Sequence, residues 1–577
     1  MSDVLRVANC SGFYGDRLSA LREQLEGGTD GQGVDVVTGD YLAELTMLIL
    51  GKDQLKDPSL GYARTFVRQL EDCLALALDK GVRIVTNAGG LNPAGLAEKL
   101  REVARAQGLE PKIAWVDGDN LAPRGAELGL DGALTANAYL GGFGIARALE
   151  AGADVVVTGR VTDASVVVGP AIWRFGWSPD QHDELAGAVV AGHVIECGTQ
   201  ATGGNFSGFL DLPRDARPLG FPIAEIAEDG SSVITKHAGT AGLVSVDTVT
   251  AQLMYEVQTD HYLGPDVTVD LTTIELAPDG DDRVRISGVK GLAPPPTLKV
   301  CVNELGGFRN QMEFVLTGLD VEEKAAWLRA QLEPRLSAAS VSWSMGSPPQ
   351  LDADNTEDAS CLLRVVVKDN DKAKVDKQFT AAGVELALAS YPGFTLTAPP
   401  APASPYGIYR AAYVERSEVQ HTVHLPDGTT EVLPDPYVEH PPDVPPKHEP
   451  VVSEAIPGVP GDAITRRIPL GTFVHARSGD KGGDANVGLW VRQGEHYGAR
   501  AQWLRQFATA DRVRELVPEA ADLDVEVYGL PNLGGVNVLI KGLLGEGVAA
   551  STRFDPQAKA LGEWIRSRFV NVPEELL

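Results

Sequence analysis

Short apolar runs alternate with stretches of helical pattern over about the first 290 of the 577 residues, and this alternation constrains the fold more than any other feature. The runs are Val4–Cys10, Val34–Thr38, Val82–Thr86, Ile113–Val116 and Ala153–Val157. Apolar runs of this length, separated by helices, are typical of parallel strands that helices cover on both faces. We therefore predict a large α/β domain with a mainly parallel sheet over residues 1–290.

A cluster of glycine and polar residues follows each of these runs. In an open parallel sheet, ligands bind in the crevice outside the carboxyl ends of the strands. Charged and amide side chains at this edge are therefore candidates for ligand contacts, although capping and turn formation also use such residues. The candidates are Asp16, Arg17, Asp40, Asn87, Asp117, Asp119, Arg160 and Asp163.

The pattern changes after residue 290. Residues 291–398 and 466–577 both have the order ββαββα, which predicts two α+β modules of ferredoxin-like layout. In the first module we expect separate strands at 297–303 and 312–316. The proline-rich residues 399–465 are predicted to be a connector that contains a hairpin around Pro426-Asp427-Gly428 and an extended spacer at Pro441, Pro442, Pro445 and Pro446.

Composition limits the partners of the chain. The 79 acidic and 50 basic residues give a net charge of −29, which argues against nucleic acid or an anionic membrane as the main partner. No apolar stretch approaches the ~20 residues of a membrane helix, and the start shows no signal peptide, so we expect a cytoplasmic protein. The five cysteines have neither disulfide-framework nor zinc-ligand spacing, and we predict no metal.

Several common catalytic and nucleotide-binding motifs are missing. The first loop has Gly12 and Gly15 in place of a GxGxxG fingerprint, and Phe13 and Tyr14 would crowd a pyrophosphate. The chain also has no P-loop, GxSxG elbow or HExxH motif. We therefore expect no redox or nucleotide cofactor.

The densest polar segment is Gly192–Asn205. If residues 185–197 form a helix, His193 and Glu196 lie three positions apart on one face near its end. Such a pair can transfer protons, with Glu196 orienting the imidazole. The alternative is a histidine favoured by the helix dipole beside an exposed glutamate.

Two further segments are candidates for anion binding. In the first, Lys236, His237 and Thr240 precede small residues at a predicted loop-to-helix junction, where backbone N–H groups could hold an anion, although an ordinary capped turn would look the same. In the second, the loop after a strand holds four polar or charged residues within five positions, so it could present two cations to an anion. These residues are Arg477, Ser478, Asp480 and Lys481.

Taken in order, the segments Thr86–Pro93, Thr158–Asp163, 192–204 and 236–240 resemble the acyclic terpene utilisation protein A (AtuA) family, over about residues 4–395. The tail, through Ala476-Arg477-Ser478-Gly479-Asp480-Lys481-Gly482, resembles the small companion domain of that family. The resemblance implies catabolism of citronellol- and geraniol-like acids or of other branched acyl-CoA compounds. It does not carry over any catalytic residue.

We therefore expect an enzyme that acts on a branched or terpenoid acyl-CoA thioester by acid–base chemistry, as a hydratase or lyase. Such a reaction requires a positioned acid or base and donors for the thioester oxyanion, and CoA enters only as part of the substrate. The predicted catalytic residues are His193, Glu196, Asp163 and Arg160. The predicted substrate-binding residues are Asp16, Arg17, Asn87, Asp117, Asp119, Lys236, His237, Thr240, Arg477, Ser478, Asp480 and Lys481, with Arg477 and Lys481 assigned to the CoA phosphates.

Two other functions remain open from the sequence. The chain could be a non-catalytic subunit that binds an acyl-CoA or terpenoid for another enzyme, or an interaction scaffold, for which polar clusters at strand ends would be wasteful. For the enzyme and for the binding subunit alike, the expected partner is an anionic small molecule. We expect a homo-oligomer.

Overall fold

The computed structural model describes residues 4–213, 217–437, 456–461 and 463–577. It divides into two compact units, the first formed by residues 1–303, 409–548 and 555–577 and the second by 304–408 and 549–554. Strands β14 (Thr297–Thr317) and β18 (Ser404–Glu415) each have residues in both units. The spacer predicted at Pro441 to Pro446 lies outside the described residues.

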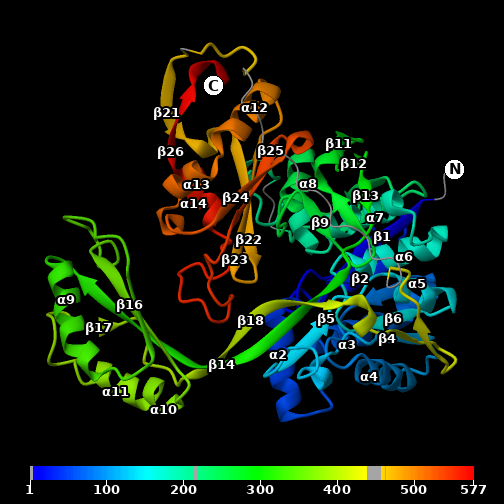
Figure 1. The fold of residues 1–577 in the computed structure, drawn as a ribbon, viewed down its shortest axis with the longest axis horizontal. Coiled ribbons are helices and arrows are strands. Elements are labelled where there is room, and N and C mark those ends of the chain that lie inside the picture. The colour runs from blue at the N-terminus through cyan, green and yellow to red at the C-terminus, as the bar shows by residue number, and fades with distance from the viewer. Residues whose placement is uncertain (1–3, 214–216, 438–455, 462) are drawn as a thin grey trace. The chain divides into compact units, whose positions relative to one another are not determined.

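Five parallel strands form the centre of an eleven-stranded sheet in the first unit (Figure 1). These strands are the five apolar runs that we predicted to be parallel, and we give them here in their sheet order: β1 (Leu5–Asn9), β2 (Val36–Gly39), β3 (Arg83–Thr86), β6 (Val155–Thr158) and β4 (Ile113–Asp117).

Helices cover both faces of these strands, as the apolar runs predicted. Consecutive side chains of a strand point to opposite faces, and Val36 and Val37 accordingly belong to two different hydrophobic cores. One core includes side chains of α5 (Phe143–Glu150), α6 (Ser165–Phe175) and α7 (His182–Ile195), and the other includes those of α1 (Ala20–Glu26), α3 (Arg64–Lys80) and α4 (Pro93–Ala106).

The sheet as a whole is mixed, so the prediction of a mainly parallel sheet is correct only for its centre. Antiparallel strands extend both edges: β7 (Pro222–Ile226), β8 (Ser232–Lys236), β12 (Val284–Ser287) and β11 (Glu275–Pro278) on one side, and the hairpin of β19 (His421–His424) and β20 (Thr430–Leu433) on the other. The turn between β7 and β8 contains Gly230 at φ +79°, and so short a connection joins only antiparallel neighbours. The hairpin pairs with β4, so part of the proline-rich segment belongs to the main sheet.

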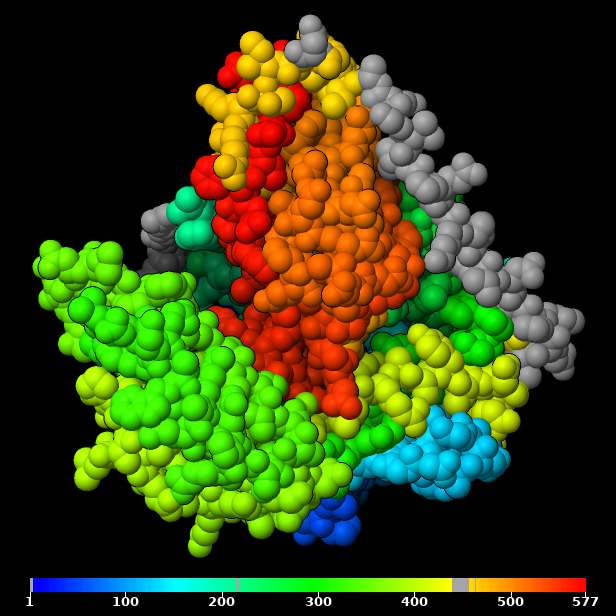
Figure 2. All heavy atoms as spheres, turned by 60° about the vertical axis from the view of Figure 1, so that its left-hand side comes forward, coloured from blue at the N-terminus to red at the C-terminus, as the bar shows by residue number. Residues whose placement is uncertain are grey.

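The C-terminal domain of the first unit has the predicted order of elements. Its four-stranded antiparallel sheet contains β22 (Val474–Lys481), β23 (Asp484–Val491), β25 (Gly535–Ile540) and β24 (Val525–Leu530). Two helices, α12 (Tyr497–Phe507) and α13 (Ala510–Leu516), stand at the first helical position of this order, because Thr509 caps the second by accepting a hydrogen bond from Arg512 N–H. Helix α14 (Leu561–Ser567) completes the domain, and strand β21 (Thr465–Pro469) pairs with β26 (Phe569–Pro573) beside it. Figure 2 shows one face of this domain in orange and red.

The second unit differs from its prediction at its first strand. The two strands expected at 297–303 and 312–316 are the single long strand β14, which continues through Gly306 and Gly307. Within the unit, β14 pairs with β16 (Ser360–Asp369) and β17 (Thr395–Leu396), and β16 pairs with β15 (Ser340–Met345). The helices are α9 (Val321–Leu332), α10 (Lys372–Val375) and α11 (Lys377–Val384). Because the single strand β14 replaces the first two expected strands, the order ββαββα is wrong for this module.

Candidate functional site

The first unit brings together charged side chains from both of its domains. We call these side chains the charged cluster. All four predicted catalytic residues belong to it, as do two of the predicted substrate-binding residues. Its members are Asp40, Glu44, Arg160, Asp163, His193, Glu196, Glu256, Lys299, Asp480 and Lys481, together with Tyr139.

Arg160 lies at the carboxyl end of β6, where the strand pattern predicted ligand contacts. It is only 2% exposed, and its Nη1 forms an ion pair with Asp163 Oδ1 at 2.8 Å. Its guanidinium lies 4.3 Å from the ring centre of Tyr139, a residue of β5 (Thr135–Ala138). Burial disfavours the guanidinium charge, but Asp163, Tyr139 and Asp40 outweigh burial and hold the pKa of Arg160 well above its usual value. Arg160 is therefore a fixed cation.

Two of the predicted substrate-binding residues instead support the strand ends. Asp119 accepts hydrogen bonds from Arg160 N–H at 2.9 Å and from Asn137 Nδ2 at 2.7 Å, and burial raises its pKa to about 6. Asn87 donates to Asp40 Oδ1 at 2.6 Å and accepts from Tyr41 N–H at 2.8 Å. Both side chains therefore bind neighbouring loops of the protein.

His193 and Glu196 form the buried pair that their spacing on a helix predicted. They lie at the end of α7, 4% and 3% exposed, with Nδ1 and Oε1 3.2 Å apart. Burial, followed by the charge of Lys481, lowers the pKa of His193 to about 4. Burial, followed by the charge of Asp163, holds the pKa of Glu196 well above its usual range. The imidazole is thus neutral at neutral pH, and burial favours the protonated form of the carboxyl.

Both members of this pair have a buried polar atom whose hydrogen bonding is incomplete, although the backbone of Tyr255 interacts with the imidazole. Within the described residues, His193 Nε2 and Glu196 Oε2 are buried and form no hydrogen bond of ordinary geometry. Buried polar atoms are satisfied in most proteins, so such atoms mark a place where a ligand can supply the missing partner. The ring of Tyr262, from β9 (His261–Leu263), packs against the imidazole with 5.0 Å between ring centres.

Four members of the cluster, Glu44, Tyr139, Glu256 and Lys299, were not predicted from the sequence. Glu44 begins α2 (Glu44–Lys56), and its Oε1 lies 3.3 Å from the hydroxyl of Tyr139 and 3.9 Å from Nζ of Lys299. Lys299 also lies 4.9 Å from the ring centre of Tyr139, so one ring contacts two cations. The positive charge of Lys299, and then that of Lys481, outweighs the effect of burial and lowers the pKa of Glu44 to about 2.

The C-terminal domain contributes Asp480 and Lys481 from the tip of the β22–β23 hairpin. The turn passes through Gly482 at φ +67°. Burial of Lys481 disfavours its charge, but Glu256 and Glu44 outweigh burial and raise its pKa, whereas burial and Glu256 raise the pKa of Asp480 to about 7. Lys481 therefore remains a cation in the cluster.

Buried amides hold this hairpin domain against the N-terminal domain. Asn486 accepts a hydrogen bond from Glu256 N–H at 2.7 Å, and Asn537 donates to the carbonyl of Val257 at 3.1 Å. Glu256 follows α8 (Val246–Leu253) at a positive φ of 57°. The same contacts therefore place the backbone of Glu256 and, through the hairpin, Lys481.

Arg477 and Ser478, from the same hairpin, lie outside the cluster. Arg477 is 5% exposed, donates to the carbonyl of Asn205 at 3.1 Å and to the side chain of Gln200, and stacks over Tyr255 with 4.2 Å to the ring centre. Ser478 Oγ accepts from Gly562 N–H at 2.8 Å. These contacts occupy both side chains with partners inside the protein.

The remaining predicted substrate-binding residues also have partners of their own. Asp16 accepts from Gly12 N–H at 3.0 Å, Arg17 pairs with Glu23 at 2.6 Å, and Asp117 accepts from His424 at 3.1 Å.

The polar side chains of the segment of Lys236, His237 and Thr240 have partners within the segment and on neighbouring elements. Lys236 Nζ forms an ion pair with Asp282 at 2.8 Å and donates to the carbonyl of Thr240. Nε2 of His237 forms a hydrogen bond with the carbonyl of Gln24 at 3.1 Å. The hydroxyl of Thr240 donates to the carbonyl of His237 at 2.7 Å. These contacts have the form of a capped turn, one of the two arrangements that the sequence left open.

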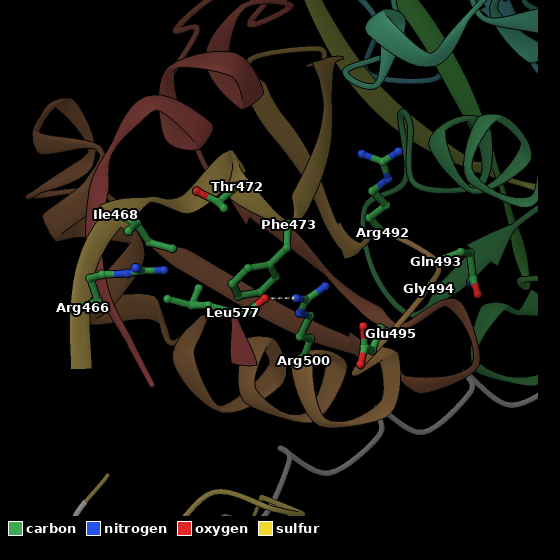
Figure 3. A pocket seen from close by; sticks show the side chains of 10 residues that line it. All are labelled: Arg466, Ile468, Thr472, Phe473, Arg492, Gln493, Gly494, Glu495, Arg500 and Leu577. Carbon is green, nitrogen blue, oxygen red and sulfur yellow. Dashed lines mark hydrogen bonds between the residues drawn. The ribbon is translucent and has the colours of Figure 1, made fainter. Parts of the chain in front are cut away.

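A separate hollow of about 420 Å³ lies in the C-terminal domain (Figure 3). Arg500 crosses it, 5.0 Å from the ring centre of Phe473, and donates to the carbonyls of Leu576 and Leu577. No predicted site residue lines this hollow. Its lining residues are Arg466, Ile468, Thr472, Phe473, Arg492, Gln493, Gly494, Glu495, Arg500 and Leu577.

The described parts of the chain lack two features, a metal-binding cluster and a membrane-spanning helix. No group of three or more His, Cys, Asp and Glu side chains there is arranged to hold a metal ion. No helix there is long and apolar enough to cross a membrane.

Two family models match the chain. The model of the acyclic terpene utilisation family protein AtuA matches residues 5–425, and that of the AtuA ferredoxin-like domain matches residues 468–571. The first match includes every N-terminal member of the charged cluster, and the second includes Asp480 and Lys481. No curated protein and no solved structure matches the chain.

Proposed function

Because the chain belongs to the acyclic terpene utilisation AtuA family, we propose that it is an enzyme of branched or acyclic terpenoid acid catabolism that acts on an acyl-CoA thioester. The reaction class is acid–base chemistry of the hydratase or lyase type. The observation that supports this most is the buried His193–Glu196 pair, whose Nδ1 and Oε1 lie 3.2 Å apart and on which the charges of Lys481 and Arg160 act.

Proton transfer follows from the protonation of this pair. With Glu196 protonated, its hydroxyl donates to Nδ1 of His193, and the ring carries its own proton on Nε2. When Nε2 gives its proton to the substrate, the proton of Glu196 moves to Nδ1. The imidazole remains neutral, and the negative charge left on Glu196 is stabilised by Lys481 and Arg160, which both favour its ionised form.

The reverse sequence removes a proton from the substrate. Nε2 accepts the proton from the carbon next to the thioester carbonyl, and Nδ1 returns its proton to Glu196. The developing oxyanion needs a fixed positive charge in a site of low dielectric, which Arg160 can provide. The proton on Nε2 would then pass to the β-hydroxyl, which leaves as water and gives the unsaturated thioester, while Glu196 returns its proton to Nδ1. Addition of water is the same path reversed.

The proposed substrate must reach Nε2 of the His193 ring. Nε2 is closed off from solvent in the ligand-free protein. Tyr262 packs on the imidazole and is itself partly exposed. We therefore propose that the substrate displaces the Tyr262 ring when it binds.

A screen by thermal shift tests this function before any turnover assay. A ligand that binds only the native state raises the melting temperature by mass action. Branched acyl-CoA esters should raise it, and they should do so less in His193→Ala, where the ring is missing. If no acyl-CoA shifts the melting temperature of the wild-type protein, the proposal fails. Binding without turnover by the purified chain would instead support a non-catalytic acyl-CoA subunit.

A further inference from the structure

One buried hydroxyl beside the charged cluster has no part in the proton relay. It belongs to Tyr409, which lies in the first-unit part of β18. Among the described residues this hydroxyl has no hydrogen-bond partner, and its oxygen is buried although the tyrosine as a whole is partly exposed. Burying a hydroxyl without a partner costs free energy, and phenylalanine would fill the same space without that cost. The stability of the fold therefore gives no reason for the hydroxyl.

The alternation of side chains along β18 places Tyr409 on one particular face of its sheet. Strand β14 pairs with both β5 and β18. Val414 of β18 packs with Val300 of β14 in one hydrophobic core. Tyr409, an odd number of positions away from Val414, packs in a different core with Tyr139 of β5. Because consecutive side chains of a strand point to opposite faces, Tyr409 lies on the face of these strands that carries Tyr139, a member of the charged cluster.

Arg160 and Tyr409 share neighbours on this face. The apolar group that Tyr409 packs against includes Tyr139 and Leu42. The guanidinium of Arg160 lies 4.3 Å from the ring centre of Tyr139, and its Nη1 donates to the carbonyl of Leu42 at 3.3 Å. The turn of the β22–β23 hairpin also touches the ring of Tyr409, since a Cβ at Gly482 would lie 2.5 Å from its Cε1. Tyr409 therefore contacts both the groups that hold Arg160 and the hairpin tip of the C-terminal domain.

The hydroxyl of Tyr409 is a donor at neutral pH. Burial, followed by Tyr139 and Glu44, holds the pKa of Tyr409 well above its usual value, so the phenol keeps its proton. A neutral phenol can donate one hydrogen bond without bringing a charge into the site. The carbonyl oxygen of a thioester is an acceptor of the matching kind.

We propose that Tyr409 donates a hydrogen bond to the carbonyl oxygen of the substrate thioester and acts together with Arg160 on the oxyanion that forms there. This inference rests on the proposed function, because it takes the substrate to be an acyl-CoA thioester. Oxyanion sites hold fixed donors where water is excluded, and removal of one donor costs about 10²–10³-fold in kcat. Like Nε2 of His193, the hydroxyl is closed off from solvent in the ligand-free protein, so it meets the substrate only after the substrate has entered.

The test follows an enolate, the charged form that such a donor should recognise. Acetoacetyl-CoA is titrated onto the wild-type protein and onto Tyr409→Phe at neutral pH, and its enolate is detected by near-ultraviolet absorbance. Butyl-CoA, a thioether without a carbonyl oxygen, is the reference ligand and is titrated by calorimetry. We expect Tyr409→Phe to bind the enolate at least tenfold more weakly than the wild-type protein, since a hydrogen bond to a charged group is lost. Its affinity for butyl-CoA should not change.

Thermal unfolding shows whether the hydroxyl has a structural partner. Because it has none among the described residues, Tyr409→Phe should melt at the wild-type temperature or above it. Tyr437→Phe is the matched control, because Tyr437 is also partly exposed but its hydroxyl donates to the carbonyl of Pro179 at 2.6 Å. This control should melt below the wild-type protein and bind both CoA compounds as the wild-type protein does.

The possible results separate this inference from the proposed function. Equal enolate affinity in the wild-type protein and Tyr409→Phe, or an equal loss of affinity for both CoA compounds, would overturn the role of Tyr409 and leave acyl-CoA binding intact. A melting temperature of Tyr409→Phe as low as that of Tyr437→Phe would also overturn it, because the hydroxyl would then have a partner within the protein. If the wild-type protein binds neither CoA compound, the proposed function fails and this inference fails with it.

Discussion

The charged cluster and the segment of Lys236, His237 and Thr240 look alike in sequence and differ in structure. Both combine a buried histidine with a lysine at the end of a regular element. In the second segment Lys236 has its own carboxylate, Asp282, and the other polar groups bond within the turn or to the carbonyl of Gln24, whereas Nδ1 of His237 has no hydrogen-bond partner among the described residues. In the cluster, charged side chains from several elements act on His193 and Glu196. The two segments therefore differ in how many charged groups the fold gathers around the histidine, and not in the residue types of their motifs.

The largest expected effect is on catalysis. His193→Ala removes the proposed acid–base group, and because such groups contribute about 10²–10⁴-fold, kcat/KM for an active acyl-CoA should fall by that factor. The matched control is His237→Ala, which removes an equally buried imidazole (4% exposed in both cases) from the other segment. A comparable loss of activity in both variants would contradict the distinction between the two regions.

The sequence predicted the part of the cluster that depends on local pattern. Arg160 and Asp163 follow from the rule about the carboxyl ends of parallel strands, and His193 with Glu196 follows from helical spacing. Glu44, Tyr139 and Lys299 have no local signal, because they meet only when β5 pairs with β14, residues 135–138 against 300–303.

The fold shows the same limit. The central parallel strands are visible as apolar runs, but the antiparallel strands at both edges are not. The hairpin of β19 and β20 was predicted from Pro426-Asp427-Gly428, whereas its pairing with β4 depends on contacts about 300 residues apart in the chain. Residues 297–303 and 312–316 were expected to be separate strands, but β14 is continuous over both.

The second prediction concerns the stability of the cluster. Arg160→Met would leave the partly buried Asp163 without its cation, and breaking a buried pair from one side costs about 3–5 kcal/mol. Arg160→Met/Asp163→Asn should recover part of this loss, because it removes the unpaired carboxylate. The free energy of unfolding from urea titration measures both.

A surface ion pair in the same sheet provides the control. Arg83 pairs with Asp154, and their side chains are 30% and 25% exposed. Because more exposed pairs are worth less, Arg83→Met should cost about 1 kcal/mol or less. If Arg160→Met lowers the free energy of unfolding by no more than Arg83→Met does, the Arg160–Asp163 pair stabilises the protein no more than a surface ion pair.

The third prediction is that the free energy of unfolding depends on pH because of the buried carboxyl group of Asp480. Its pKa is about 7 in the folded protein and about 3.8 in the absence of such surroundings, so the folded state holds the proton more tightly. The resulting stabilisation is complete below about pH 3.8 and is lost as the pH rises through about 7. Asp480→Asn should thus become more stable relative to the wild-type protein from pH 4 to pH 8. A difference in unfolding free energy that stays constant over this range would contradict the assignment.

The smallest effect is expected from the other region. Lys236→Met breaks the pair with Asp282, whose side chain is 34% exposed, and should cost about 1 kcal/mol of stability. The kcat/KM for an acyl-CoA should change less than twofold, because Lys236 lies outside the charged cluster. A tenfold loss without unfolding would place this segment in the substrate site after all.

The measurement that tests proton transfer by His193 most directly is hydrogen exchange at the carbon next to the thioester. The purified protein is incubated in D₂O with 3-hydroxy-3-methylbutyryl-CoA, a branched β-hydroxyacyl thioester, and the α-hydrogens are followed by ¹H NMR. We predict that the wild-type protein and His237→Ala exchange them for deuterium and that His193→Ala exchanges at least 100-fold more slowly. No exchange by the wild-type protein, or equal rates in the wild type and His193→Ala, would contradict the proposed role of the His193–Glu196 pair.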